Sequence, residues 1–136
     1  MKKIALFMAA LLLLVSCDRL QQNQLLGVWR FERITSYDYT TGKEELAGTN
    51  WKTITFKRGG IGYQNDNPIT YKLQGDELSI TWEGSTTTTV NVNRQERLTN
   101  TYTIDELTRD RLQISQDYLD YNKKKHKSTF YFSRFE

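Results

Sequence analysis

Apolar and polar residues alternate along most of the chain from Leu25 onward, and this period of two limits the possible folds more than any other feature. Such alternation is typical of β-strands that bury one face. After Cys17, no window of about a dozen residues keeps the spacing of an amphipathic helix. Strands are therefore expected at about 26–37, 51–57, 61–65, 69–74, 77–82, 86–98, 101–107, 111–119 and 128–135, with loops at 38–50 and 120–127 and another loop around Pro68.

Eight or nine antiparallel strands with short connections, and no helix to cover a sheet, leave two architectures. One is a closed up-and-down barrel and the other is a sandwich. Sequential hairpins favour the barrel, and closure removes the sheet edges that would otherwise invite aggregation. We therefore expect an all-β fold, an antiparallel up-and-down β-barrel of about eight strands, in a single domain.

The N-terminus, "MKKIALFMAALLLLVSC", has the parts of a secretory signal. Lys2 and Lys3 form a positive region, an apolar run of about a dozen residues follows, and small Ser16 precedes Cys17. The run is shorter than the roughly 20 residues that a membrane-spanning helix needs. The expected organisation is a signal peptide over 1–16, a polar tether over 17–24 and the barrel domain over 25–136.

The end of this signal, Leu14-Val15-Ser16-Cys17, resembles the lipobox of bacterial lipoproteins. The resemblance implies that Cys17 becomes the first residue, carries palmitate or similar acyl chains and anchors the protein in a membrane of the cell envelope. Acyl chains contribute about 0.8 kcal/mol per buried methylene, so several chains would anchor it permanently. Asp18 resembles an inner-membrane retention signal of enteric bacteria, but other lineages ignore that rule, so which membrane stays open.

The charge balance depends on whether the signal is removed. The whole chain has 19 Lys and Arg against 16 Asp and Glu. Without Lys2 and Lys3, 17 basic residues face 16 acidic ones. This balance gives no reason to expect a nucleic acid as a partner.

Gly27 and Trp29 open the first strand, in "LLGVWRF". They resemble the Gly-x-Trp signature of lipocalins and fatty-acid-binding proteins, and with the ordered hairpins the likeness to short bacterial lipocalin-like (calycin) lipoproteins covers residues 25–136. It implies that Trp29 closes one end of the barrel, that Gly27 permits close packing there, and that Arg134 crosses the indole, with Arg111 a weaker choice. By the same resemblance, a small hydrophobic ligand binds in the open mouth.

Long lipocalins carry a helix before the last strand, and fatty-acid-binding proteins carry two lid helices. This sequence has no counterpart to either, because 120–127 is short and polar. Two functions follow: a binder of a small hydrophobic ligand, or an interaction module or inhibitor with a side-chain-filled barrel that docks another envelope protein. An apolar cavity above Trp29 would favour the first and a filled interior the second. The expected fillers are Ile54, Phe56, Leu73, Ile80 and Ile114, and the aromatic residues expected at the mouth are Tyr37, Tyr39, Trp51, Tyr118 and Tyr121.

Residues for catalysis or metal binding are scarce. His126 is the only histidine, and it lies in "KKKHK", which we interpret as a solvated loop. One histidine without a free thiol cannot supply the three or four ligands of a zinc site. Cys17 is the only cysteine, so no disulfide forms within the chain. We expect no catalytic residue, no metal and no cofactor, and a protein that is not an enzyme.

Overall fold

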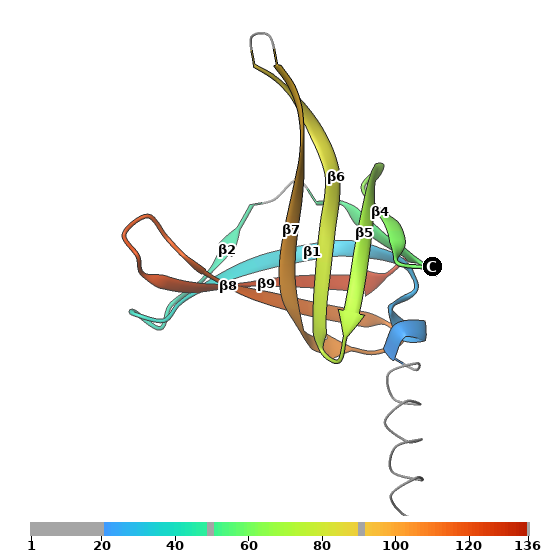
Figure 1. Ribbon diagram of the computed structural model, residues 1–136. Helices are drawn as coiled ribbons and strands as arrows, with labels where there is room; N and C mark the ends of the chain where they lie inside the picture. The colour runs from blue at the N-terminus through green and yellow to red at the C-terminus, as the bar shows by residue number, and fades with distance from the viewer. Residues whose placement is uncertain (1–20, 49–50, 90–91, 136) are drawn as a thin grey trace, which may run out of the picture.

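A computed structural model describes residues 21–48, 51–89 and 92–135, with residues 84–89 and 92–97 described by their backbone alone. A helical turn over residues 21–25 leads into nine strands (Figure 1). The strands are β1 (Gly27–Asp38), β2 (Glu44–Ala47), β3 (Thr53–Lys57), β4 (Ile61–Gln64), β5 (Asn67–Gln74), β6 (Glu77–Thr89), β7 (Val92–Leu107), β8 (Arg111–Leu119) and β9 (Lys125–Arg134).

The strands form one antiparallel sheet that closes on itself. From β3 to β9 each strand pairs with the next in sequence, and β1 joins β3 on one edge to β9 on the other. Eight strands therefore make a closed barrel, which confirms the expected fold. The extra strand, β2, pairs with the second half of β1, beyond the point where β3 ends.

The core lies inside the barrel because alternate residues of each strand point inward. Trp29, Ile54, Leu78, Ile80 and Ile114 have no exposed surface. The remaining buried hydrophobic residues of the described chain are Leu25, Ile34, Phe56, Ile69, Tyr102, Ile104, Leu112, Phe130 and Phe132.

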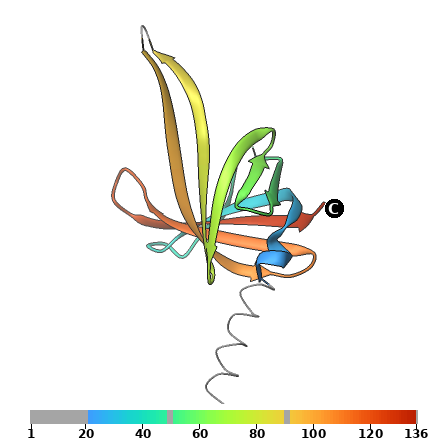
Figure 2. The same cartoon turned by 45° about the vertical axis from the view of Figure 1, so that its right-hand side comes forward.

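The wall splits into two extensions at the open end of the barrel. The β5–β6 pairing stops at Ile69 opposite Trp82, and the β7–β8 pairing at Thr103 opposite Ser115. Beyond these points β6 and β7 continue as a two-stranded ribbon, which rises away from the barrel in both views (Figures 1 and 2). β8, β9, β1 and β2 continue together in another direction, toward the left in Figure 1.

Four local expectations are corrected. The expected loop 38–50 contains β2. The single strand expected at 86–98 is divided between β6 and β7, which are far longer than anticipated. β9 begins at Lys125, inside the expected loop 120–127. Pro68 lies in β5 opposite Tyr63, one residue after the strand begins, a position that proline tolerates.

Candidate functional site

The closed end of the barrel is built around Trp29. Its indole is fully buried, and Nε1 donates a hydrogen bond of 2.8 Å to the carbonyl of Leu25 in the preceding helical turn. The guanidinium carbon of Arg134 lies 3.9 Å from the centre of the indole ring. Gly27 enters β1 with φ 124°, a backbone conformation that other residues rarely adopt. The structure thus brings together the three residues that the resemblance placed at this end.

Arg134 also binds the backbone around the indole. Its Nη1 donates to the carbonyl of Leu26 at 2.5 Å and its Nη2 to that of Gln24 at 2.6 Å. Its Nε donates to the carbonyl of Arg109, between β7 and β8, at 2.9 Å. Burial lowers the pKa of this guanidinium, although the carboxylate of Asp110 opposes the effect. Because an arginine stays charged in proteins, one cation joins the start and the end of the chain.

Side chains fill the interior above Trp29. Ile54, Phe56, Ile80 and Ile114 are at most 1% exposed, and half-buried Leu73 packs against them. These are the five residues expected in a filled barrel.

Trp51, expected at the rim, is half-buried and packs against the core toward the open end. Its ring centre lies 5.0 Å from that of Phe130, 5.8 Å from that of Phe132 and 5.9 Å from that of Trp82. The indole of Trp82 is held in turn by a hydrogen bond of 2.6 Å to Gln64 Oε1. An aromatic layer therefore covers the aliphatic core toward the open end.

A cavity of about 290 Å³ lies at the closed end, beside the helical turn 21–25 rather than above Trp29. Its lining is largely polar and comes from that turn and from the end of β5: Gln21, Gln22, Leu73, Gln74 and Gly75. Amide side chains and a glycine do not form the apolar lining expected of a hydrophobic ligand site.

Tyr37 and Tyr39 lie together on the outer face of the β1–β9–β8 extension. Their ring centres are 5.2 Å apart in an edge-to-face arrangement. Tyr39 Oη donates to Asp117 at 3.0 Å, and Lys125 Nζ lies 5.1 Å from the centre of the Tyr39 ring. The hydrogen bond to Asp117 raises the pKa of Tyr39. We call the residues Tyr37, Tyr39, Asp117 and Lys125 the tyrosine cluster.

Tyr118 belongs to the opposite face of the same extension. It lies opposite His126 in the register, and the two rings stack at 5.2 Å. Its hydroxyl shares a hydrogen bond of 2.9 Å with that of Ser36. Tyr121 stands at the tip of the β8–β9 hairpin and is 95% exposed. The five aromatic residues expected at one mouth are therefore spread over an outer face, an inner face, a hairpin tip and the core.

His126 is ordered, and its interpretation as part of a solvated loop is wrong. Its side chain is 17% exposed, and Nε2 lies 2.8 Å from Asp120 Oδ2. Asp120 Oδ1 accepts hydrogen bonds of 2.9 Å from the backbone amides of Asn122 and Lys124. These amides, and the hydrogen bond with His126, lower the pKa of Asp120. The spacing of Asp120 and His126 across a short turn was the signal that could have revealed the pair.

The His126–Asp120 pair has the geometry of a structural tie rather than of a catalytic dyad. The two nearby hydroxyls, on Ser36 and Tyr118, bond to each other and not to the imidazole. Across the described ranges, His, Cys, Asp and Glu nowhere gather in a group of three that could hold a metal ion. In the same part of the chain, no helix has the length and apolarity to cross a membrane. Cys17 lies outside the described residues.

Comparison with models of known protein families found no match, and comparison with curated proteins also found none. The likeness to lipocalin-like lipoproteins therefore stays a prediction from the sequence.

Proposed function

We propose that this protein is a lipid-anchored, non-enzymatic interaction module of the bacterial cell envelope, in which the barrel is a rigid scaffold for a protein partner. The observation that carries the proposal is the filled interior. Ile54, Phe56, Ile80 and Ile114 are buried, and the aromatic layer at Trp51 covers them. An eight-stranded barrel of this kind is packed by its own side chains.

The competing function, binding of a small hydrophobic ligand in the barrel mouth, needs space that these side chains occupy. A ligand entering from the open end would have to displace Trp51 from Phe130, Phe132 and Trp82. Such aromatic contacts stabilise by roughly 0.5–1.5 kcal/mol per pair beyond the area they bury. The interaction module leaves all three contacts intact, and the geometry supports it better.

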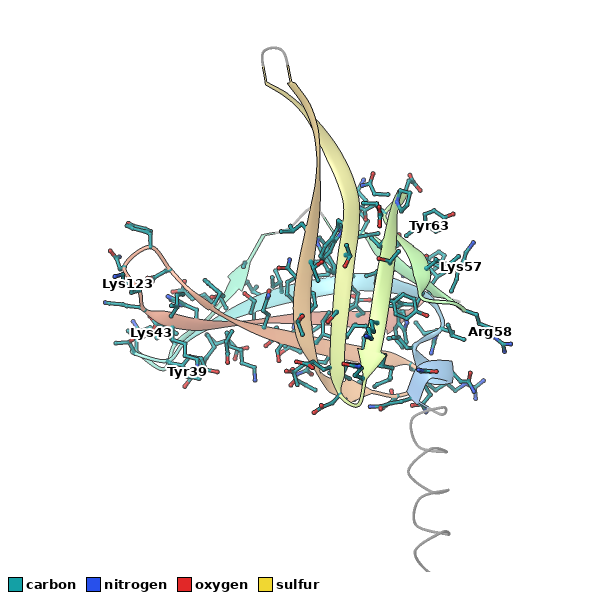
Figure 3. All side chains as sticks on the ribbon, viewed as in Figure 1. Tyr39, Lys43, Lys57, Arg58, Tyr63 and Lys123 are labelled. Carbon is teal, nitrogen blue, oxygen red and sulfur yellow. The ribbon has the colours of Figure 1, made fainter. Side chains whose placement is uncertain are left out.

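The tyrosine cluster is the surface that we assign to the partner. Tyr37 is 36% exposed and Tyr39 46%, and exposed Leu46, Leu119 and Tyr121 lie on the same extension. Tyrosine is enriched at protein interfaces because its ring supplies apolar contact area and its hydroxyl a hydrogen bond. Figure 3 shows Tyr39, Lys43 and Lys123 at this end of the molecule.

Site-specific photocrosslinking in cells tests the partner surface. A photoreactive phenylalanine at Tyr39 or Tyr121 is expected to give one discrete protein adduct, and the same group at exposed Thr99, on the outer wall of β7, none. Native mass spectrometry of the purified protein should show the mass of the chain alone apart from its anchor. A co-purifying small apolar molecule, with no adduct at Tyr39 or Tyr121, would overturn the proposal in favour of ligand transport.

The anchor is tested separately by changing Cys17 to Ala. This change removes the sulfur that would carry the lipid, so we expect the protein to leave the membrane fraction. Membrane and soluble fractions are compared by immunoblotting, with Ser16→Ala as a control that keeps a small residue before the cysteine. A Cys17→Ala chain that still sediments with membranes would contradict lipidation.

A further inference from the structure

One part of the outer barrel wall combines exposed cations with exposed apolar side chains. Ile61 is 53% exposed, Tyr63 41% and Phe135 48%. Arg30 covers Phe135, with 4.6 Å between its guanidinium carbon and the ring centre, and Lys57 Nζ lies 5.1 Å from the centre of the Tyr63 ring. With Arg58 in the β3–β4 turn, these residues form what we call the basic wall: Arg30, Lys57, Arg58, Ile61, Tyr63 and Phe135.

Carboxylates are absent from the outward positions that join these residues. The register places Val28 and Arg30 of β1 opposite Thr55 and Thr53 of β3, and these four point outward. The outward row continues through β4 to Pro68 and Thr70 of β5. Glu32 borders the wall farther along β1, where it accepts a hydrogen bond from Ser133. Among the described residues, the paired outward positions from Arg30 of β1 to Thr70 of β5 carry no acid, and Glu32 and exposed Asp66, in the β4–β5 turn, lie at their border.

Little chain separates the expected lipid attachment from the part of the barrel that carries the basic wall. Gln21, in the helical turn, is four positions after Cys17, and a fully extended chain over four positions spans at most about 14 Å. The turn is fixed to the barrel by Arg134, which holds the carbonyls of Gln24 and Leu26. Past this turn, Gly27 lies opposite Phe56, next to Lys57, and the amide of Phe135 donates to the carbonyl of Val28 at 2.9 Å.

From this geometry we infer that the basic wall docks on anionic lipid headgroups of the membrane that holds the anchor. The inference rests on the proposed lipidation of Cys17. Lys57 and Arg58 match the charge of phosphate groups, and Tyr63, Ile61 and Phe135 suit the boundary between headgroups and acyl chains. The short anchored tether supplies this contact at a high effective concentration.

The same docking directs the proposed partner surface away from the membrane. Lys57, Arg58 and Tyr63 lie on one side of the molecule, and Tyr39, Lys43 and Lys123 lie on the opposite side (Figure 3). A bilayer beneath the basic wall therefore leaves the tyrosine cluster free for a protein.

Amine acylation of the lipidated protein tests the inference. The protein is placed in vesicles of phosphatidylglycerol and phosphatidylethanolamine, in vesicles of phosphatidylcholine alone, or in neutral detergent, and each lysine is quantified by mass spectrometry. Lys57 should react several-fold more slowly in the anionic vesicles than in detergent, while Lys43 and Lys123 react equally in all three. Added salt should restore much of the Lys57 reactivity, because salt screens exposed charges.

Variants separate docking from a local effect on one lysine. Arg30→Gln with Arg58→Gln leaves Lys57 as the reporter and should restore its reactivity in anionic vesicles. The matched pair Lys123→Gln with Lys124→Gln at the opposite end should leave Lys57 protected.

Three results would overturn the inference, and each has a different meaning. Lys57 that reacts equally in anionic vesicles and in detergent shows that the wall does not touch lipid. Lys57 protected in native envelope vesicles but not in pure lipid shows that a protein covers the wall. If the purified chain lacks the mass of an acyl group and also fails to float with vesicles, the protein has no lipid anchor. The proposed function is then wrong as well.

Discussion

The indole of Trp29 contacts three parts of the chain that are far apart in sequence. Its Nε1 bonds to Leu25 in the helical turn, its ring lies under Arg134 near the C-terminus, and its backbone pairs with Ile54 of β3. A residue with these contacts stabilises the fold and is unavailable to a ligand.

Trp29→Ala should lower the free energy of unfolding by about 3–5 kcal/mol, as expected when a large buried aromatic is removed and leaves a cavity. Denaturant unfolding followed by circular dichroism measures the change. Tyr121→Ala, at the exposed hairpin tip, should change stability by less than about 0.5 kcal/mol. Equal stability of the Trp29 variant and the wild type would refute the role of Trp29 as a barrel seal.

Ionisation of Tyr102 should make the stability of the fold depend on pH in the alkaline range. Burial raises its pKa to about 12, because the charged phenolate is costly to desolvate. A raised acid pKa means that the stabilising effect of the neutral phenol is complete below pH 10 and is lost as pH rises from about 10 to about 12. The two units correspond to about 2–3 kcal/mol. The free energies of unfolding of the wild type and Tyr102→Phe, plotted against pH, should diverge only above pH 10. Curves that stay parallel above pH 10 would contradict a raised pKa for Tyr102.

At the scale of elements, the β8–β9 hairpin is tied by one carboxylate. Asp120 accepts the amides of Asn122 and Lys124 and meets His126 on the incoming strand. Lys123, between these two amides, has φ 61° and completes the tight turn. The tie fixes the position of Tyr121 at the tip.

Because the hydrogen bonds lower the pKa of Asp120, its stabilisation of the hairpin is present above the usual carboxyl value of 3.8 and is lost as pH falls through the lower folded-state value. The amide NMR signals of Asn122 and Lys124 should shift in that acidic window. Asp120→Asn should abolish the transition. Signals that move instead near neutral pH would assign the change to another group.

The sequence predicted most strands but not how far they extend. Inward apolar residues such as Ile54 and Phe56, or Leu78 and Ile80, alternate clearly with outward polar ones. The run "STTTT" offers no alternation, so the turn between β6 and β7 could not be located from it. β2 was missed because "EELA" is exposed throughout and is held by backbone pairing with β1 alone. Local composition carries no signal for such a strand.

For a related reason, the sequence could not show which of the aromatic residues expected at the mouth share a face of the sheet. Whether two tyrosines share a face depends on strand register, which is set by the closed sheet and not by neighbouring residues. Tyr37 lies opposite Lys127 and Tyr118 lies opposite His126, one position apart, and this single step sends the two side chains to opposite faces. Trp51 precedes β3 and packs inward, because Phe130 and Phe132 offer it an aromatic surface.

At the scale of the whole molecule, Arg134 joins the tether to the last strand. Arg134→Gln should lower the free energy of unfolding by roughly 2–3 kcal/mol, because three charged hydrogen bonds to backbone carbonyls are lost together with the contact on Trp29. Arg134→Lys keeps the charge but loses the planar, forked set of donors of the guanidinium. Its free energy of unfolding should therefore lie between those of the wild type and Arg134→Gln. Hydrogen exchange at Leu26 should quicken in the same order, and an unchanged rate in Arg134→Gln would show that the tether is held by other contacts.

The pairing of β1 with β9 also sets when the molecule can fold. The ribosome makes β1 before β9, so Trp29, Phe31 and Ile34 cannot pair with Arg134, Phe132 and Phe130 until β9 has been made. Pairings this distant in sequence form late in folding. A chain in which β9 has not been made therefore cannot close the barrel, and an unclosed chain with the expected signal peptide can still be threaded through a translocation channel.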